Sequence, residues 1–261
     1  MRKTTRIAVT GAAALAAAAF GVSGAEAEDG GSGNITIDKV VVNGGKPVVV
    51  GSTSPVSFKV SVTVSDDSGI NTVSYISPEG PGSNYASAWY EDGDITCVTV
   101  SATTKTCSAT LKFDPKATVG FVDNSAAGTW NVRTLASAKD YDYIHRDVAG
   151  TFKVLRSARL TANASPEPVA KGKKITVTGE LTRANWETNT YAGYTSQPVQ
   201  LQFRKKGSST YTTVKTVKSS ATSRKLSTTV TASTDGYWRW SFAGTSTTAP
   251  VKSAGDYLDV R

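Results

Sequence analysis

The stretch Val56-Ser57-Phe58-Lys59-Val60-Ser61-Val62-Thr63-Val64 alternates apolar and polar side chains without a break. Successive side chains of a β-strand point to opposite faces, so this pattern predicts a strand with one face in a core and the other in water. The whole chain is rich in Thr, Ser, Val and Gly, a composition that also favours strands over helices.

The same two-residue period recurs along the chain in two successive blocks. It appears at residues 35–40, 130–135 and 152–154 in the first block, and at 175–181, 199–203 and 226–230 in the second. In the second block, residues 237–242 place Trp238, Trp240 and Phe242 on one face of a single strand. Three large aromatic rings on one face need burial, so we expect them at the centre of a second core.

The spacing of these segments predicts an all-β protein. Many short strands, separated by turns and repeated in two blocks, are typical of two β-sandwiches. We place a first domain at residues 35–157 and a second at 158–261, with Pro166-Glu167-Pro168 near the opening of the second. Residues 28–34 are rich in glycine, and we expect them to form a flexible leader.

Both blocks resemble bacterial immunoglobulin-like domains. The resemblance rests on residues 64–70 and 127–132 in the first block and on residues 177–181 and 235–242 in the second. Residues 28–261 as a whole resemble secreted two-domain proteins of actinobacteria, which are often labelled calcium-binding. The resemblance implies two immunoglobulin-like β-sandwich domains in tandem, and it supplies no catalytic residues.

The N-terminal residues predict export. Arg2, Lys3 and Arg6 form a basic segment, the uncharged stretch 7–22 follows, and Ala25-Glu26-Ala27 offers small residues for cleavage. This is the pattern of a secretory signal peptide, and we expect cleavage after Ala27, with cleavage after Ala25 as the alternative. Removing residues 1–27 lowers the formal net charge from +8 to +6. We expect a secreted, extracellular monomer with no transmembrane segment.

The two cysteines, Cys97 and Cys107, are expected to form a disulfide. Thiols pair in an oxidising compartment, and these two lie on either side of a short polar stretch, 103–105, between two strand-like segments. Antiparallel partners across such a hairpin stand at disulfide distance. We assign the bond a structural role, because a redox site would favour a C-x-x-C spacing.

No catalytic constellation emerges from the residues. The chain has one histidine, His145, and no G-x-S-x-G motif singles out a serine as a nucleophile. No pair of carboxylates stands out as the acid and base of a glycosidase. We therefore expect a non-catalytic binding or structural module that requires no cofactor.

Calcium is the first candidate ligand. Calcium takes six to eight oxygen ligands, mostly from carboxylates and backbone carbonyls. The sequence does not contain an EF-hand loop, but loops at one end of a sandwich could bring Asp66, Asp67, Asp140 and Asp142 together. The alternative is ordinary turn chemistry, in which Asp side chains bond to their own backbone.

A glycan is the second candidate ligand. Clustered aromatic residues in polar segments suggest rings on which a sugar could stack: Trp89, Tyr90, Trp186, Tyr191 and Tyr194. The alternative is that Trp186 and Tyr191 fold over the end of a core.

The basic residues suggest a third kind of ligand, an anionic cell-wall polymer. The dense clusters are Lys171, Lys173 and Lys174, and Arg204-Lys205-Lys206. Such clusters attract polyanions, although lysines on strand edges also serve to block edge-to-edge pairing. The sequence contains no nucleic-acid-binding motif, so we do not expect a nucleic-acid partner.

Overall fold

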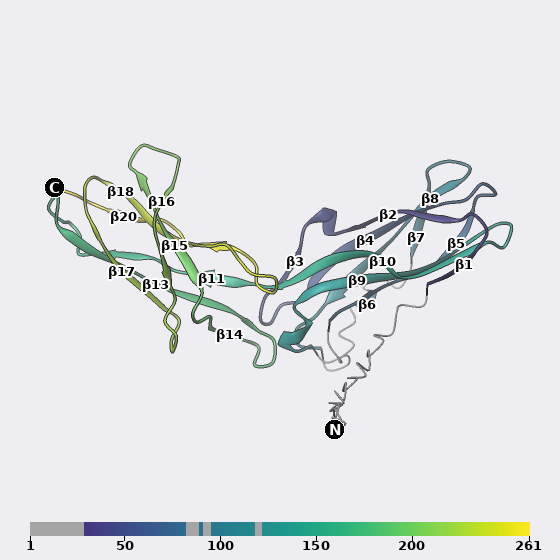
Figure 1. The fold of residues 1–261 in the computed structure, drawn as a ribbon, viewed down its shortest axis with the longest axis horizontal. Coiled ribbons are helices and arrows are strands. Elements are labelled where there is room, and N and C mark those ends of the chain that lie inside the picture. The colour runs from purple at the N-terminus through teal and green to yellow at the C-terminus, as the bar shows by residue number, and fades with distance from the viewer. Residues whose placement is uncertain (1–28, 82–88, 91–94, 118–121) are drawn as a thin grey trace, which may run out of the picture.

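The computed structural model describes residues 29–81, 89–90, 95–117 and 122–261. The predicted signal peptide lies outside the described residues. The described chain consists of β-strands and two short 3₁₀ turns, η1 (Asn43–Gly45) and η2 (Asn124–Ala126), which confirms the prediction of an all-β protein. Figure 1 shows two lobes joined end to end. In the described ranges, no helix is long and apolar enough to cross a membrane.

The described part of the first lobe contains ten strands. They are β1 (Gly30–Ser32), β2 (Thr36–Val42), β3 (Val48–Val50), β4 (Val56–Ser65), β5 (Ile70–Glu79), β6 (Trp89–Tyr90), β7 (Thr96–Thr99), β8 (Thr104–Phe113), β9 (Gly128–Ala138) and β10 (Tyr143–Arg156). One sheet has the order β2-β4-β8, with β6 and β7 on the free edge of β8. The other has the order β5-β9-β10, with β1 antiparallel and β3 parallel to β10. This division of strands between two sheets is that of an immunoglobulin-like sandwich.

The second lobe is a smaller sandwich. Its strands are β11 (Ala158–Leu160), β12 (Asn163–Ser165), β13 (Lys174–Asn185), β14 (Thr190–Gly193), β15 (Pro198–Lys205), β16 (Thr212–Lys218), β17 (Lys225–Thr231), β18 (Gly236–Phe242), β19 (Val251–Lys252) and β20 (Asp256–Leu258). In one sheet β13 is central, with β11 and β12 on one side and β14 and β17 on the other. The other sheet has the order β16-β15-β18, with β19 and β20 on β18.

The alternating segments bury the faces that the sequence predicts. In β4, Val60, Val62 and Val64 are fully buried while the residues between them are partly exposed. In β18, Trp238, Trp240 and Phe242 are all buried in the second core, as predicted. The buried apolar residues form two clusters, and along the chain the change from the first to the second falls between Val154 and Ala158.

The expected flexible leader is instead a β-strand. Residues 30–32 pair antiparallel with residues 143–145 of β10. Glycine permits this close approach, because a Cβ on Gly31 would lie 3.0 Å from the carbonyl oxygen of Tyr143. The prediction of a flexible leader is therefore wrong for these residues. Gly31 packs closely against the edge of β10, a strand far away in the chain that no local pattern indicates as a neighbour.

The predicted disulfide between Cys97 and Cys107 is confirmed. The two residues face each other across β7 and β8, with their Cα atoms 4.0 Å apart. Cys107 is fully buried in the first core, where it lies opposite Val62 of β4. The bond thus attaches the exposed strand β7 to a core strand.

Replacing both cysteines, as Cys97→Ala and Cys107→Ala, is expected to destabilise the first lobe. The bond closes a loop with a sequence separation of 10, and a loop of that size contributes about 2–3 kcal/mol in the chain-entropy model. Urea unfolding of the two forms should show this difference as a lower midpoint. An unchanged midpoint would mean that β7 and β8 are held equally well without the bond.

Candidate functional site

Two turns at one end of the first lobe bring acidic side chains together. Asp66 directly follows β4, and Asp140 and Asp142 lie in the turn between β9 and β10. Strand β10 begins at this turn and ends at Arg156, beside the second lobe. The acidic end is therefore the end of the first lobe that lies away from the junction.

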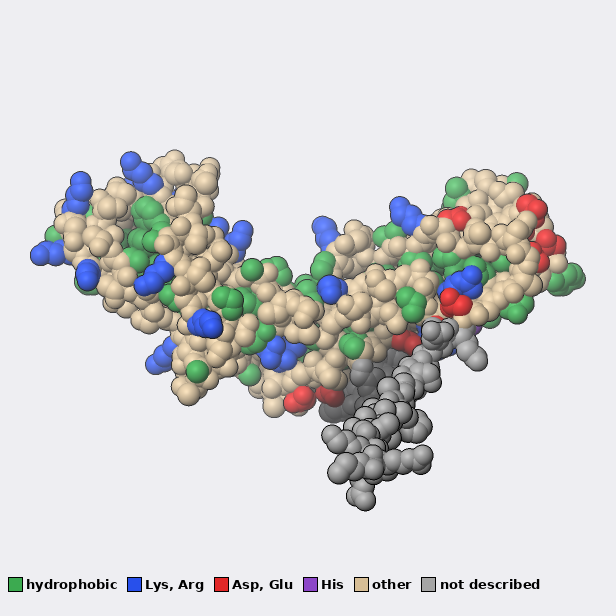
Figure 2. Space-filling view, viewed as in Figure 1, with side chains coloured by type: hydrophobic (Ala, Val, Ile, Leu, Met, Phe, Trp, Pro, Cys, Tyr) green, Lys and Arg blue, Asp and Glu red, His purple; other side chains and the backbone are tan. Residues whose placement is uncertain are grey.

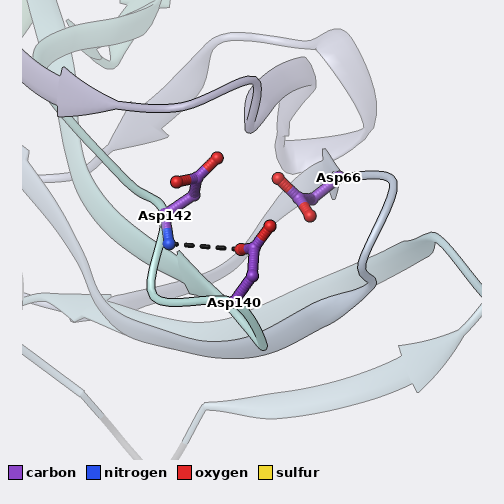
Figure 3. Close-up of side chains that lie close together, drawn as sticks. All are labelled: Asp66, Asp140 and Asp142. Carbon is purple, nitrogen blue, oxygen red and sulfur yellow. Dashed lines mark hydrogen bonds between the residues drawn. The ribbon is translucent and has the colours of Figure 1, made fainter.

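The three carboxylates form a compact group. Asp66, Asp140 and Asp142 each offer an oxygen, and these oxygens all lie within 4.8 Å of one another. Figure 3 shows Asp142 and Asp66 on opposite sides of the space between them, with Asp140 below. Oxygens on opposite sides of a calcium ion stand about 4.6–5.2 Å apart, since each Ca–O distance is about 2.3–2.6 Å. The spacing thus fits a calcium ion.

Asp66 is the buried member of the group. Its side chain is only 4% exposed. One oxygen, Oδ1, accepts hydrogen bonds from the backbone N–H of Ser68 at 2.8 Å and from the Ser68 hydroxyl at 2.6 Å. The other, Oδ2, is buried and has no hydrogen-bond partner. A buried carboxylate oxygen without a partner is costly, and a cation would satisfy it.

The hairpin orients the other two carboxylates. The backbone N–H of Asp142 donates to Oδ1 of Asp140 at 3.2 Å, across Tyr141, whose φ of 74° lies in the left-handed region. Oδ2 of Asp142 accepts from the backbone N–H of Asn34 at 2.9 Å. The segment after β1 therefore belongs to the site, and Gly33 packs so closely on Asp142 that a Cβ there would overlap its carboxylate.

Within the described part of the chain, no ion pair neutralises this group. Among the ion pairs between described residues, none involves Asp66, Asp140 or Asp142. Asp67, the fourth predicted ligand, is exposed and lies outside the group. The structure thus brings three of the four predicted residues together. The sequence prediction missed Asn34 and Ser68, whose contacts depend on the docked β1 and on the turn after β4.

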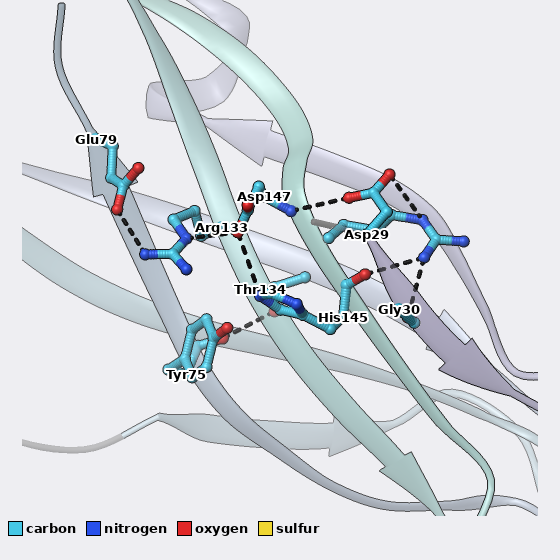
Figure 4. Close-up of polar contacts among 9 residues, drawn as sticks. Asp29, Gly30, Tyr75, Glu79, Arg133, Thr134, His145 and Asp147 are labelled. Carbon is cyan, nitrogen blue, oxygen red and sulfur yellow. Dashed lines mark hydrogen bonds and ion pairs between the residues drawn. The ribbon is translucent and has the colours of Figure 1, made fainter. Parts of the chain in front are cut away.

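A second polar cluster lies on the sheet of β5, β9 and β10. Arg133 bonds to Glu79 at 2.7 Å and to Asp147 at 2.8 Å (Figure 4). The hydrogen bond that Arg133 donates to Glu79 raises the pKa of Arg133, and burial raises the pKa of Tyr75. His145 lies here with its Nε2 atom 3.3 Å from Asp147.

The same cluster holds the N-terminal strand. The backbone N–H of Asp147 donates to Asp29 at 3.1 Å, and Arg146 donates to the carbonyl oxygen of Gly30 at 3.1 Å. These contacts fix β1 on β10. We therefore interpret the cluster as a structural network across strands.

Trp186 is not an exposed ring. It is 2% exposed and belongs to the core of the first lobe, although its position in the chain is in the second. Its ring lies 5.1 Å from that of Phe113, and its Nε1–H donates to the carbonyl oxygen of Gly51 at 2.9 Å. The prediction that this ring stacks on a glycan is wrong, because the β13–β14 hairpin inserts it into the neighbouring lobe.

The other predicted aromatic residues are divided between different surroundings. Tyr191 packs against the first core under the guanidinium of Arg159, 3.6 Å away, while Tyr194 packs against the second core. Trp89 and Tyr90 form β6, but their side chains lie outside the described part of the structure. The five rings therefore do not make up one described surface.

The junction also buries a charge. Arg156 is 6% exposed, and its Nε–H donates to the carbonyl oxygen of Ala184 at 2.6 Å. Burial and the nearby positive charge of Arg183 lower the pKa of Arg156 to about 10. The guanidinium therefore stays charged at neutral pH. With Trp186, this contact ties the end of β10 to the end of β13.

The fold and the acidic group together define a class of protein: a tandem of immunoglobulin-like β-sandwiches with a candidate cation site. No family model and no curated protein matches the chain. It is similar to an I-band fragment of titin, with 14% identity over 87% of this chain and 65% of that one, at a TM-score of 0.31. The chain thus corresponds to about two thirds of the length of that fragment.

Two further solved structures show a similar degree of likeness. The D00–D0 domain of intimin is 14% identical over 84% of this chain and 99% of that one, with a TM-score of 0.27. The three N-terminal domains of the highly immunogenic outer capsid protein of bacteriophage RB49 are 11% identical over 85% and 70%, with a TM-score of 0.31. At such low identities and TM-scores, these similarities do not indicate a function.

The buried position of Trp186 predicts the effect of removing it. Trp186→Ala should destabilise the first lobe by about 3–5 kcal/mol, the usual cost of emptying a core aromatic site. Trp186→Phe should recover much of this loss, because it keeps a ring against Phe113 while losing the bond to Gly51. Calorimetric unfolding of the full chain measures both. If Trp186→Ala left melting unchanged, the insertion into the first core would be refuted.

Proposed function

We propose that this protein is an extracellular, non-catalytic β-sandwich module whose first domain binds calcium. The observation that carries the proposal is the buried Oδ2 of Asp66, which lacks a hydrogen-bond partner and lies within a group of three carboxylates. Mutual repulsion and burial both oppose this arrangement of negative charge. A divalent cation would remove both costs at once.

The ligand atoms favour calcium over transition metals. All three side chains are carboxylates, the hard oxygen donors that calcium prefers, and the group contains no His or Cys. Three carboxylates provide up to six oxygens, and water can complete the shell. Because Asp140 is exposed and the ligands come from loops, the site resembles the adaptable geometry of calcium sites more than the strict octahedron of magnesium.

Calcium at this position would connect three separate segments. Asp66 lies in the turn after β4, and Asp140 and Asp142 lie in the β9–β10 hairpin. The segment after β1 is joined to them by Asn34, whose backbone N–H donates to Asp142. The ion would thus clamp the far end of the first lobe. We propose a structural role for the ion, in which it makes this end more rigid and more resistant to unfolding.

An extracellular location agrees with both chemistry and sequence. The disulfide between Cys97 and Cys107 is typical of an oxidising compartment, and the N-terminal sequence predicts a signal peptide. Calcium sites of extracellular modules bind with dissociation constants of about 0.1–1 mM. A partly exposed site of three carboxylates is consistent with an affinity in that range.

Calcium should raise the melting temperature of the chelated protein. A ligand at about 100 times its dissociation constant adds about 2.7 kcal/mol of stability, which corresponds to a rise of roughly 5–10 °C for a domain of this size. Differential scanning calorimetry after chelation, with calcium added back stepwise, gives the size of the shift. Magnesium at the same concentrations should produce a smaller one.

Two neighbouring substitutions test where the ion binds. Asp66→Asn keeps the Oδ1 contacts to Ser68 but removes the charge, so the calcium shift should disappear without a loss of stability in the chelated protein. Asp67→Asn removes an equal charge one residue away, outside the group, and should leave the shift intact. An equal loss in both variants, or an absence of any shift in the native protein, would refute the proposed site.

A further inference from the structure

The two lobes differ strongly in charge. Residues 28–157 contain 11 basic and 14 acidic residues, a formal charge of −3, whereas residues 158–261 contain 15 basic and 6 acidic residues, a formal charge of +9. Figure 2 shows Lys and Arg side chains spread over the second lobe, while acidic side chains gather toward the far end of the first. Within residues 28–261, the excess of basic charge therefore comes from the second lobe alone.

Most of these cations have no acidic partner. In residues 158–261, all of which the structure describes, the ion pairs are Lys206–Asp235, Arg224–Glu180 and Arg261–Asp259. The remaining basic residues repel one another within a small domain. Such an excess of one sign opposes the compact state and attracts polyanions.

On one sheet face of the second lobe, arginine side chains lie against tyrosine rings. Across β15, β18 and β20, Arg204 lies opposite Tyr237, and Tyr237 lies opposite Tyr257. The guanidinium of Arg204 stands 4.1 Å from the Tyr237 ring centre, and that of Arg239 stands 3.6 Å from the Tyr211 ring centre. The positions alternate with the buried Trp238 and Trp240, so this row lies on the outward face.

Hydrogen bonds fix both guanidiniums without neutralising them. Arg204 donates to the carbonyl oxygen of Ser208, and Arg239 donates through Nε–H to Oε1 of Gln202 at 2.9 Å. Neither arginine pairs with a carboxylate among the described residues. Their other N–H groups are held in a fixed direction, which reduces the entropy lost on binding an anion.

A basic pocket extends this face at one end. It is lined by four basic residues, Lys171, Lys205, Lys206 and Arg261, and by Ser233, Thr234, Val260 and Asp235. Asp235 is the one acidic residue of this lining, and its carboxylate pairs with Lys206 at 3.4 Å. The Lys206 ammonium donates to the Tyr257 hydroxyl at 3.1 Å, so the pocket is continuous with the row of rings. We call the two together the anion face, defined by Arg204, Arg239, Tyr211, Tyr237, Tyr257 and Lys206 with the pocket.

We propose that the anion face docks an anionic polysaccharide that carries carboxylate or sulfate groups. Fixed guanidiniums and the pocket lysines would bind the charged groups, and the side chains of Gln200 and Thr213 beside them offer hydrogen bonds to sugar hydroxyls. A single-stranded nucleic acid fits less well, because base stacking needs free ring faces and guanidiniums already cover the Tyr211 and Tyr237 rings. This inference does not depend on the calcium site.

Binding to defined polymers tests the proposal. The probes are polygalacturonate, which carries carboxylates, dextran sulfate, neutral dextran and a thymidine oligonucleotide, all measured on the full chain by biolayer interferometry with a chelator present. We expect binding to both anionic polysaccharides at about 50 mM salt, none to neutral dextran, and loss of binding at about 0.5 M salt because screening weakens the attraction. No binding to either anionic polysaccharide, or tighter binding to the oligonucleotide, overturns the proposal.

Matched variants distinguish binding at the anion face from nonspecific attraction by the net positive charge. Arg204→Gln with Arg239→Gln should weaken polysaccharide binding about tenfold or more, since charge-assisted contacts are lost. Lys59→Gln with Lys225→Gln removes the same charge from exposed positions on β4 and β17 and should change binding less than about threefold, as expected for distant charges. If the arginine variant does not fold, Lys171→Gln with Lys206→Gln tests the pocket with less disturbance. Equal effects in the test and control variants overturn the assignment.

Discussion

Burial of every second side chain is the constraint on which the rest of this structure depends. Each strand must cover one apolar face with the opposite sheet, so strands such as β4 and β9 run the length of the sandwich and turn at its ends. The turn after β4 and the hairpin after β9 consequently meet at one end of the first lobe. Asp66, Asp140 and Asp142 converge because the core fixes where their strands stop.

The two candidate binding regions have opposite charge and lie in different lobes. The carboxylate group marks the far end of the first lobe, and the anion face lies on the outward sheet face of the second. Trp186 and Arg156 couple the lobes, since one fills the core of the neighbouring lobe and the other bonds across the junction.

Sequence patterns succeeded where the information is local. The period of two identified β4, β13 and β18 with their buried faces, and the spacing of Cys97 and Cys107 predicted their bond. Three of the four predicted acidic ligands also came together, because turns at the same end of a sandwich are close in space. Asp67 does not join this group, because adjacent residues in a turn point in different directions and its side chain is exposed.

The sequence by itself determined the all-β class, the two blocks and the charge of the chain, because alternation and composition act residue by residue. Only the tertiary structure decided that Gly30 to Ser32 form a strand, that Trp186 enters the other lobe, and that Arg204 lies against Tyr237. These contacts join segments far apart in the chain. Whether a ring is exposed or buried depends on which distant surface covers it, and no local pattern encodes that neighbour.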